Sequence, residues 1–143
     1  TYAQSMGTIL LVRALVEEKS ALQPKIIVLD SPFLSFQWAG MSVLSQNWFT
    51  TAFQPLAYLL LSDEWAPGRR IRELSPTPIL IFHGDADRVV DFRLGQEAFE
   101  AALPPKEFVR IPGGRHVPAF WGDNAEKYRE IFISRLDAAV KSD

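Results

Sequence analysis

The sequence contains no cysteine, so it offers neither a disulfide framework nor a thiol for nucleophilic chemistry or metal binding. Its two histidines stand in no recognisable ligand spacing, and we therefore expect no metal centre. Neither a dinucleotide-binding glycine pattern nor a phosphate-binding loop is present, and no cofactor is expected. The lack of cysteine also fits a cytoplasmic protein.

An excess of charge of one sign is also missing. The formal net charge is −2, which gives no broad electrostatic attraction to nucleic acid. A short basic cluster, Arg69, Arg70 and Arg72, is expected to be a solvated surface turn. The longest apolar run near the middle, residues 55–61, is far shorter than the roughly 20 residues that span a bilayer, so no membrane span is expected.

Strand and helix patterns alternate along the 143 residues, 48% of which are hydrophobic. The expected elements are a helix over 6–16, a strand over 25–30, one or two helices within 33–62, a polar connection over 63–75, a strand over 78–82, a helix after Asp91, a strand over 107–111 and a final helix. Such alternation predicts an α/β protein with a parallel sheet, flanking helices and right-handed crossovers.

Local signals refine these helices. The segment 6–16 is apolar on nearly all sides, which is typical of a buried helix. Asp91 can cap the helix that follows it, and Pro104-Pro105 should end that helix. Asp123 can cap the last helix, with Glu126 three residues later as in a capping box.

Three residues with complementary chemistry come at places that a parallel sheet brings together. Ser5 opens a helix, Asp87 follows the strand 78–82 and His116 follows the strand 107–111. Reactive residues gather beyond the carboxyl ends of such strands. A serine hydroxyl becomes a good nucleophile when an imidazole takes its proton and a carboxylate orients that imidazole. The set favours a catalytic role for Ser5 over simple capping of its helix.

Three motifs carry a family resemblance: A-Q-S-M-G at 3–7, H-G-D-A-D-R-V-V at 83–90 and P-G-G-R-H at 112–116. Over essentially its whole length the chain resembles the C-terminal half of an α/β-hydrolase-fold serine hydrolase. The resemblance implies that Ser5 is the nucleophile, Asp87 the acid and His116 the base. It also implies that the backbone N–H of Met6 supplies one oxyanion donor.

The sequence departs from the family pattern in two ways. Ala3, Thr8 and Asp91 replace residues that are commonly glycine, glycine and proline. The resemblance also implies five earlier strands, including the one that leads into Ser5, and a loop with the second oxyanion amide. We expect none of these in the sequence. We therefore expect residues 1–143 to be the C-terminal portion of one domain. Strand 25–30 would then expose an unpaired edge, which a missing N-terminal segment or self-association would complete.

Other polar residues near the motifs have competing interpretations. His83 is expected to be structural, with a hydrogen bond to its loop, and Asp85 is expected to bond loop amides. Asp30 ends the strand 25–30, where a minority of related enzymes place the acid, so it stays an alternative to Asp87.

The aromatic segment 33–62 has two interpretations. It could be a lid inserted over an acyl pocket, or a set of helices that pack on the sheet. Phe33, Trp38 and Trp121 are weak candidates for a pocket wall.

The resemblance implies hydrolysis of an ester, thioester or related acyl bond of a small molecule through an acyl-Ser5 intermediate, with carboxylesterases, lipases and thioesterases favoured over peptidases. The alternative is a catalytically inactive fragment, or a structural and interaction module of the same fold, that lacks a full oxyanion hole. Substrate identity and acyl length stay open.

Overall fold

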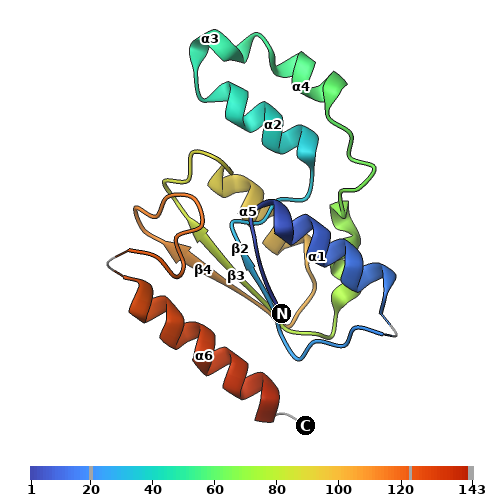
Figure 1. Cartoon of the computed structure of the whole chain (residues 1–143), viewed down its shortest axis with the longest axis vertical. Coiled ribbons are helices and arrows are strands. Elements are labelled where there is room, and N and C mark those ends of the chain that lie inside the picture. Colours follow the sequence, from blue (N-terminus) through green and yellow to red (C-terminus); the bar gives the residue numbers. More distant parts are fainter. Residues whose placement is uncertain (20, 123, 142–143) are drawn as a thin grey trace.

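A computed structural model describes residues 1–19, 21–122 and 124–141 of the chain (Figure 1). The elements in order are β1 (Tyr2–Gln4), α1 (Met6–Glu17), β2 (Ile27–Asp30), α2 (Phe36–Ser45), α3 (Trp48–Thr51), α4 (Gln54–Leu60), the 3₁₀ helix η1 (Gly68–Leu74), β3 (Ile79–Gly84), α5 (Phe92–Ala101), β4 (Lys106–Ile111) and α6 (Ala125–Lys141).

The four strands form one parallel sheet in the order β1-β2-β3-β4. Successive residues of β2 and β3 point to opposite faces of the sheet. Ile27 and Ile81 lie in a core cluster with α1, η1 and α5, whereas Val28 and Phe82 lie in a second cluster with α6. The sheet is therefore a middle layer between helices (Figure 1), which confirms the predicted α/β class.

The strand that leads into Ser5 is present, contrary to expectation. Residues Tyr2–Gln4 pair in parallel with β2, placing Tyr2 opposite Val28 and Gln4 opposite Asp30. The prediction that β2 exposes an unpaired edge was wrong, since β1 covers it. A three-residue strand with two polar side chains has neither the length nor the alternation that identifies a strand in a sequence.

Strand β3 runs two residues farther than predicted. His83 and Gly84 belong to the strand and pair with Arg110 and Ile111 of β4, although the sequence suggested a loop there. A glycine is required at this point because a Cβ on Gly84 would lie 2.2 Å from the carbonyl oxygen of Gly114. The loop after β4 therefore packs directly on the backbone of β3.

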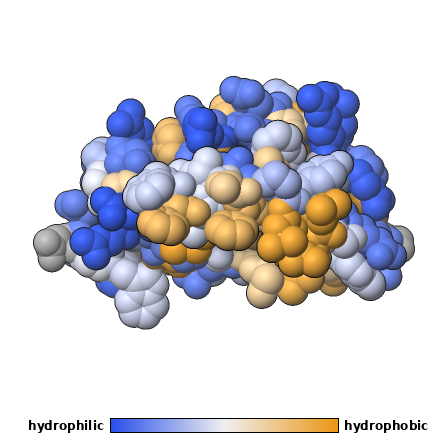
Figure 2. Space-filling view, turned by 90° about the horizontal axis from the view of Figure 1, so that it is seen from above, coloured by the Kyte–Doolittle hydropathy of each residue, from blue (hydrophilic) through white to orange (hydrophobic). Residues whose placement is uncertain are grey.

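The segment 33–62 forms three helices rather than one or two. Asn47 caps α3 by accepting a hydrogen bond from the backbone N–H of Phe49, and Pro55 stands in the first turn of α4. The segment contains no charged residue. Figure 2 shows apolar side chains gathered on this face. The large hydrophobic residues exposed by α3, α4 and the turn between them are Trp48, Phe49, Phe53, Leu56, Leu59 and Leu60.

Two other segments differ from expectation. The connection 63–75 contains η1, which buries Ile71 and Leu74 because their spacing puts both on its inner side. Helix α1 is buried on one side only and exposes Met6 and Leu10. The neighbouring layer, η1 with α5 and the sheet, covers only the opposite side of α1.

The predicted cap of α5 is confirmed. Asp91 caps α5, accepting a hydrogen bond from the backbone N–H of Arg93 at 2.9 Å. Helix α6 packs on the sheet through Tyr128 and Ala139, whereas its predicted cap Asp123 lies outside the described residues. Within the described part of the chain, no helix has both the length and the apolar character to cross a membrane.

Candidate active site

Ser5 occupies a sharp turn between β1 and α1. Its backbone has φ 47° and ψ −126°, a conformation that residues other than glycine rarely adopt. The backbone N–H of Ser5 donates to the carbonyl oxygen of Asp30 at 2.9 Å, and its own carbonyl accepts from the backbone N–H of Thr8 at 2.9 Å. These bonds hold Ser5 at the carboxyl end of the sheet.

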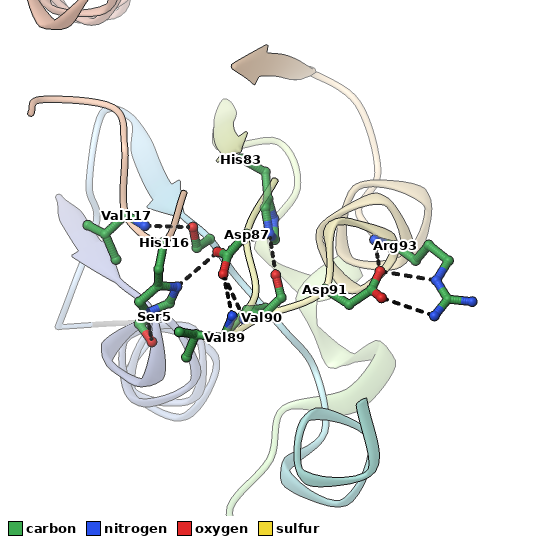
Figure 3. A network of polar contacts seen from close by, with 10 residues as sticks. Ser5, His83, Asp87, Val89, Val90, Asp91, Arg93, His116 and Val117 are labelled. Carbon is green, nitrogen blue, oxygen red and sulfur yellow. Dashed lines mark hydrogen bonds and ion pairs between the residues drawn. The ribbon is translucent and has the colours of Figure 1, made fainter. Parts of the chain in front are cut away.

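Ser5, His116 and Asp87 form a continuous hydrogen-bonded chain (Figure 3). The Oγ of Ser5 lies 2.9 Å from Nε2 of His116, and Nδ1 of His116 lies 2.9 Å from Oδ2 of Asp87. A carboxylate only accepts hydrogen bonds, so Nδ1 carries the imidazole proton. Nε2 is then free to accept the hydroxyl proton of Ser5, which is the arrangement that a general base requires.

The protein holds the carboxylate of Asp87 in place through contacts other than its bond to His116. Its side chain is fully buried. Its Oδ1 accepts hydrogen bonds from the backbone N–H groups of Val89 and Val90 at 2.8 and 2.9 Å (Figure 3). Because the loop occupies Oδ1, Oδ2 is the oxygen that faces the imidazole.

His83 forms a hydrogen bond to the same loop. Its ring is fully buried and Nε2 lies 3.0 Å from the carbonyl oxygen of Val90, so Nε2 donates. This confirms the predicted loop-bonding role. Burial lowers the pKa of His83, which keeps the ring neutral. A Cβ on Gly95 would lie 2.0 Å from Nδ1 of this ring, so α5 packs directly against it.

Backbone strain is concentrated around these residues. Among the described residues, the non-glycine positions with positive φ are Ser5, Ser31 (52°) and Val117 (53°). Ser31 follows β2, Val117 follows His116, and the Oγ of Ser31 accepts a hydrogen bond from the backbone N–H of Val117 at 3.2 Å. Strain of this kind clusters at functional sites. No sequence pattern points to Ser31 or Val117, since positive φ at such residues is set by tertiary contacts.

Asp30, the alternative acid, has a different partner. It is fully buried, and its Oδ2 accepts a hydrogen bond from the hydroxyl of Tyr2 at 3.2 Å. Burial raises the pKa of Asp30 to about 6, against the weaker lowering effect of the Tyr2 hydroxyl. The structure brings Asp87, not Asp30, to Nδ1 of His116.

The raised pKa of Asp30 predicts a pH-dependent stability. The unfolded carboxyl has its ordinary pKa of 3.8, so between about pH 4 and pH 6 the folded state binds more protons. Stability from this group is fully present below pH 4 and is lost as the pH rises to about 6. The difference corresponds to about 3 kcal/mol. We expect the free energy of unfolding of Asp30→Asn, measured relative to the unsubstituted chain by urea denaturation, to rise by about that amount from pH 4 to pH 6 and to stay level above. A difference that is the same at every pH would contradict this.

The remaining predicted residues lie in different surroundings. Met6 is the first residue of α1, so its backbone N–H is one of the amides that a helix leaves without an internal acceptor. Phe33 is buried in a core cluster with Ile9, whereas the side chains of Trp38 and Trp121 are 60% and 72% exposed. Neither Trp38 nor Trp121 lines the pocket beside His116, and neither does Phe33.

Asp85 acts on the loop, as predicted. It accepts hydrogen bonds from the backbone N–H of Gly113 at 2.7 Å and from the Arg110 guanidinium at 2.8 Å. The Arg110 guanidinium, followed by the Gly113 amide, holds the pKa of Asp85 below its usual value. This bridge joins the loops that carry Asp87 and His116.

Comparison of the sequence with curated proteins finds relatives in bacteria and in Xenopus laevis. The chain is 34% identical over 118 residues to the uncharacterized protein YfhR of Salmonella typhimurium, a match that covers 82% of this chain and 37% of YfhR. It is 28% identical over 136 residues to the alpha/beta hydrolase domain-containing protein 17B of Xenopus laevis, covering 94% of this chain and 41% of the relative. The chain thus spans well under half the length of these relatives. No family model matches the sequence.

Solved structures with the same arrangement of elements include hydrolases. The esterase domain of a Rhodothermus marinus protein superposes with a TM-score of 0.60 at 15% identity, covering 96% of this chain and 59% of that domain. The monoacylglycerol lipase of Paleococcus ferrophilus superposes with a TM-score of 0.67 at 14% identity, covering 96% of this chain and 67% of the lipase. At these identities the likeness concerns the fold.

Proposed function

The chain has the α/β-hydrolase fold, and we propose from this premise that it is a serine hydrolase that cleaves an ester or related acyl bond through an acyl-Ser5 intermediate. The observation that carries the proposal is the hydrogen-bonded chain from Ser5 through His116 to Asp87. The strained backbone of Ser5 supports it further, because it lifts the hydroxyl out of the turn toward the imidazole.

The proposed reaction proceeds in two halves. In the first, the Oγ of Ser5 attacks the acyl carbon while its proton moves to Nε2 of His116; the bond from the acyl carbon to the leaving oxygen then breaks, and Nε2 returns the proton to that oxygen. In the second, water attacks the acyl carbon while its proton moves to Nε2; the bond from the acyl carbon to the Oγ of Ser5 then breaks, Nε2 returns the proton to Oγ, and the acid leaves. Asp87 stabilises the imidazolium that forms in both halves and remains ionised.

Charge that develops on the substrate oxygen needs hydrogen-bond donors. The backbone N–H of Met6 is at the start of α1, where the unpaired amides and the helix dipole both favour negative charge. We assign it as one oxyanion donor.

The helices α2 to α4 are proposed as the lid over the acyl group. They carry no charged residue, and Phe49 and Leu59 are among their exposed side chains. Figure 2 shows apolar side chains gathered on this face. A surface of this kind suits an apolar acyl chain, because no charged group must lose its water when the chain binds. Trp38 belongs to the same lid, and we do not extend the proposal to Phe33 or Trp121.

A fluorophosphonate probe tests the proposal. Attack by Ser5 on phosphorus displaces fluoride and leaves a stable phosphonyl adduct, which intact-mass spectrometry detects. We expect one adduct per chain, located on Ser5 by peptide mapping, because Ser5 is the serine hydrogen-bonded to an imidazole nitrogen.

Two variants control this labelling. Ser5→Ala should abolish the adduct, and Ser134→Ala, a substitution of an exposed serine on α6, should leave it unchanged. Circular dichroism establishes that each chain is folded. A folded chain that takes no label, or a label that survives Ser5→Ala, would contradict the proposal; the first result would favour the inactive, structural module instead.

A further inference from the structure

A pocket of about 660 Å³ lies beside His116 and has two arginines in its wall. The loop after β3 contributes Ala86, Arg88 and Val89, and the loop after β4 contributes Gly113, Arg115 and His116. Both arginines are exposed to solvent. The pocket therefore combines an apolar wall, two guanidinium groups and the imidazole of the proposed triad.

None of the described residues neutralises the positive charge of this pocket. Among them, no carboxylate lines the pocket, and neither Arg88 nor Arg115 has an ion-pair or hydrogen-bond partner. The acidic residues of the segment between β3 and α5 have other partners. Asp85 pairs with Arg110 at 2.7 Å, Asp87 binds His116, and Asp91 pairs with Arg93 at 3.0 Å (Figure 3 shows the last two).

The position of His116 decides which part of a substrate would enter. In the proposed reaction Nε2 must hand a proton to the leaving oxygen, so the leaving group has to contact this imidazole. A pocket that His116 itself lines is therefore on the leaving-group side, whereas the apolar helices α2 to α4 are separate from it.

We infer that the leaving group of the substrate carries an anion, a carboxylate or a phosphate, that Arg88 and Arg115 bind. This inference rests on the proposed function. Guanidinium groups suit both anions because their fork of N–H groups matches two oxygens at once. The substrate class is then an acyl ester of an acidic alcohol or phenol, with a neutral, apolar acyl part.

Matched phosphonate probes test the inference without requiring turnover. Three alkylphosphonate esters leave the same adduct on Ser5 and differ only in the departing phenol: 4-hydroxybenzamide, 4-hydroxybenzoate or 4-hydroxyphenyl phosphate. In each, the Oγ of Ser5 bonds to phosphorus, the bond from phosphorus to the phenol oxygen breaks, and the serine proton passes through His116 to that oxygen. The measured quantity is the second-order rate constant of adduct formation.

We expect the anionic phenols to react about 3- to 10-fold faster than the amide, since exposed ion pairs contribute modestly. The anionic probe with the larger rate constant relative to the amide probe identifies the preferred anion, carboxylate or phosphate. Arg88→Gln and Arg115→Gln should each reduce the advantage, their combination should remove it, and 0.5 M NaCl should weaken it. The advantage is taken within each variant as the ratio of its anionic-probe rate to its amide-probe rate, so a general change in labelling cancels. Arg93→Gln, which removes a guanidinium already paired with Asp91, is the matched control and should keep the full advantage.

Two results separate the possible failures. If the amide probe labels Ser5 but the anionic probes have no advantage, or if the double variant keeps that advantage, the inference is overturned and the proposed function stands. If none of the three probes labels a folded chain, the proposed function fails, and this inference fails with it.

Discussion

Replacing Asp87 with asparagine is expected to lower the rate of Ser5 phosphonylation by about 10⁴-fold while leaving the fold intact. The asparagine carbonyl can take over Oδ1, which accepts the backbone N–H groups of Val89 and Val90. Its amide NH₂ then faces Nδ1 of His116 and donates to it. The imidazole must carry its proton on Nε2, so it cannot accept the proton of Ser5. Labelling rates and thermal unfolding of the variant measure the two effects separately.

Asp30→Asn is the control for this result. Asp30 is also a buried carboxylate at the end of a strand, but it binds Tyr2 and not His116. We expect this variant to label at a rate within a few-fold of the unsubstituted chain. If Asp30→Asn loses the rate and Asp87→Asn keeps it, the acid is assigned to the wrong strand.

The second large effect is expected at Gly84. A Cβ at this position would lie 2.2 Å from the carbonyl oxygen of Gly114 and 2.6 Å from that of Arg115. These are backbone atoms, which no rotamer change can move. Gly84→Ala must therefore push the loop that carries His116 away from β3. We expect a loss of about 3 kcal/mol in the free energy of unfolding, measured by urea denaturation, together with a large loss of labelling.

Gly7→Ala provides the matched comparison. The added Cβ meets only the Cβ of Ala3 at 3.9 Å, an ordinary contact, and Gly7 lies within α1. Alanine in a helix is favoured over glycine by roughly 0.5–1 kcal/mol, so this variant should be as stable as the unsubstituted chain or more so. Equal stability of the two alanine variants would show that the loop at Gly114 is not held against β3.

The sequence was informative where a residue's role depends on its immediate neighbours. Strands β2 and β3 are short apolar runs next to turn residues, and Asp91 stands directly before an amphipathic helix. The strands are recognisable in the sequence because a strand buried on both faces needs continuous apolar residues. The pairing of Ser5 with Asp87 and His116 was also predictable, because their places after strands determine where a parallel sheet puts them.

What the sequence could not supply depends on contacts between distant segments. Strand β1 exists because β2 offers it hydrogen-bond partners, not because Tyr2–Gln4 favours a strand. Ser31 supports the site through one hydrogen bond to Val117, across 86 residues of chain. The freedom of Arg88 and Arg115 follows from the pairing of neighbouring carboxylates with other partners, which only the fold determines.

The hydrogen bond between Ser5 and His116 also has a consequence for how the protein folds. It joins residues separated by 111 positions, and the strands that hold its two ends are the first and last of the sheet. Closing so long a loop is slow, and it is rewarded only after the intervening strands have paired. Reactivity of Ser5 during refolding therefore reports completion of the whole sheet, and it should return later than the signal of the helices.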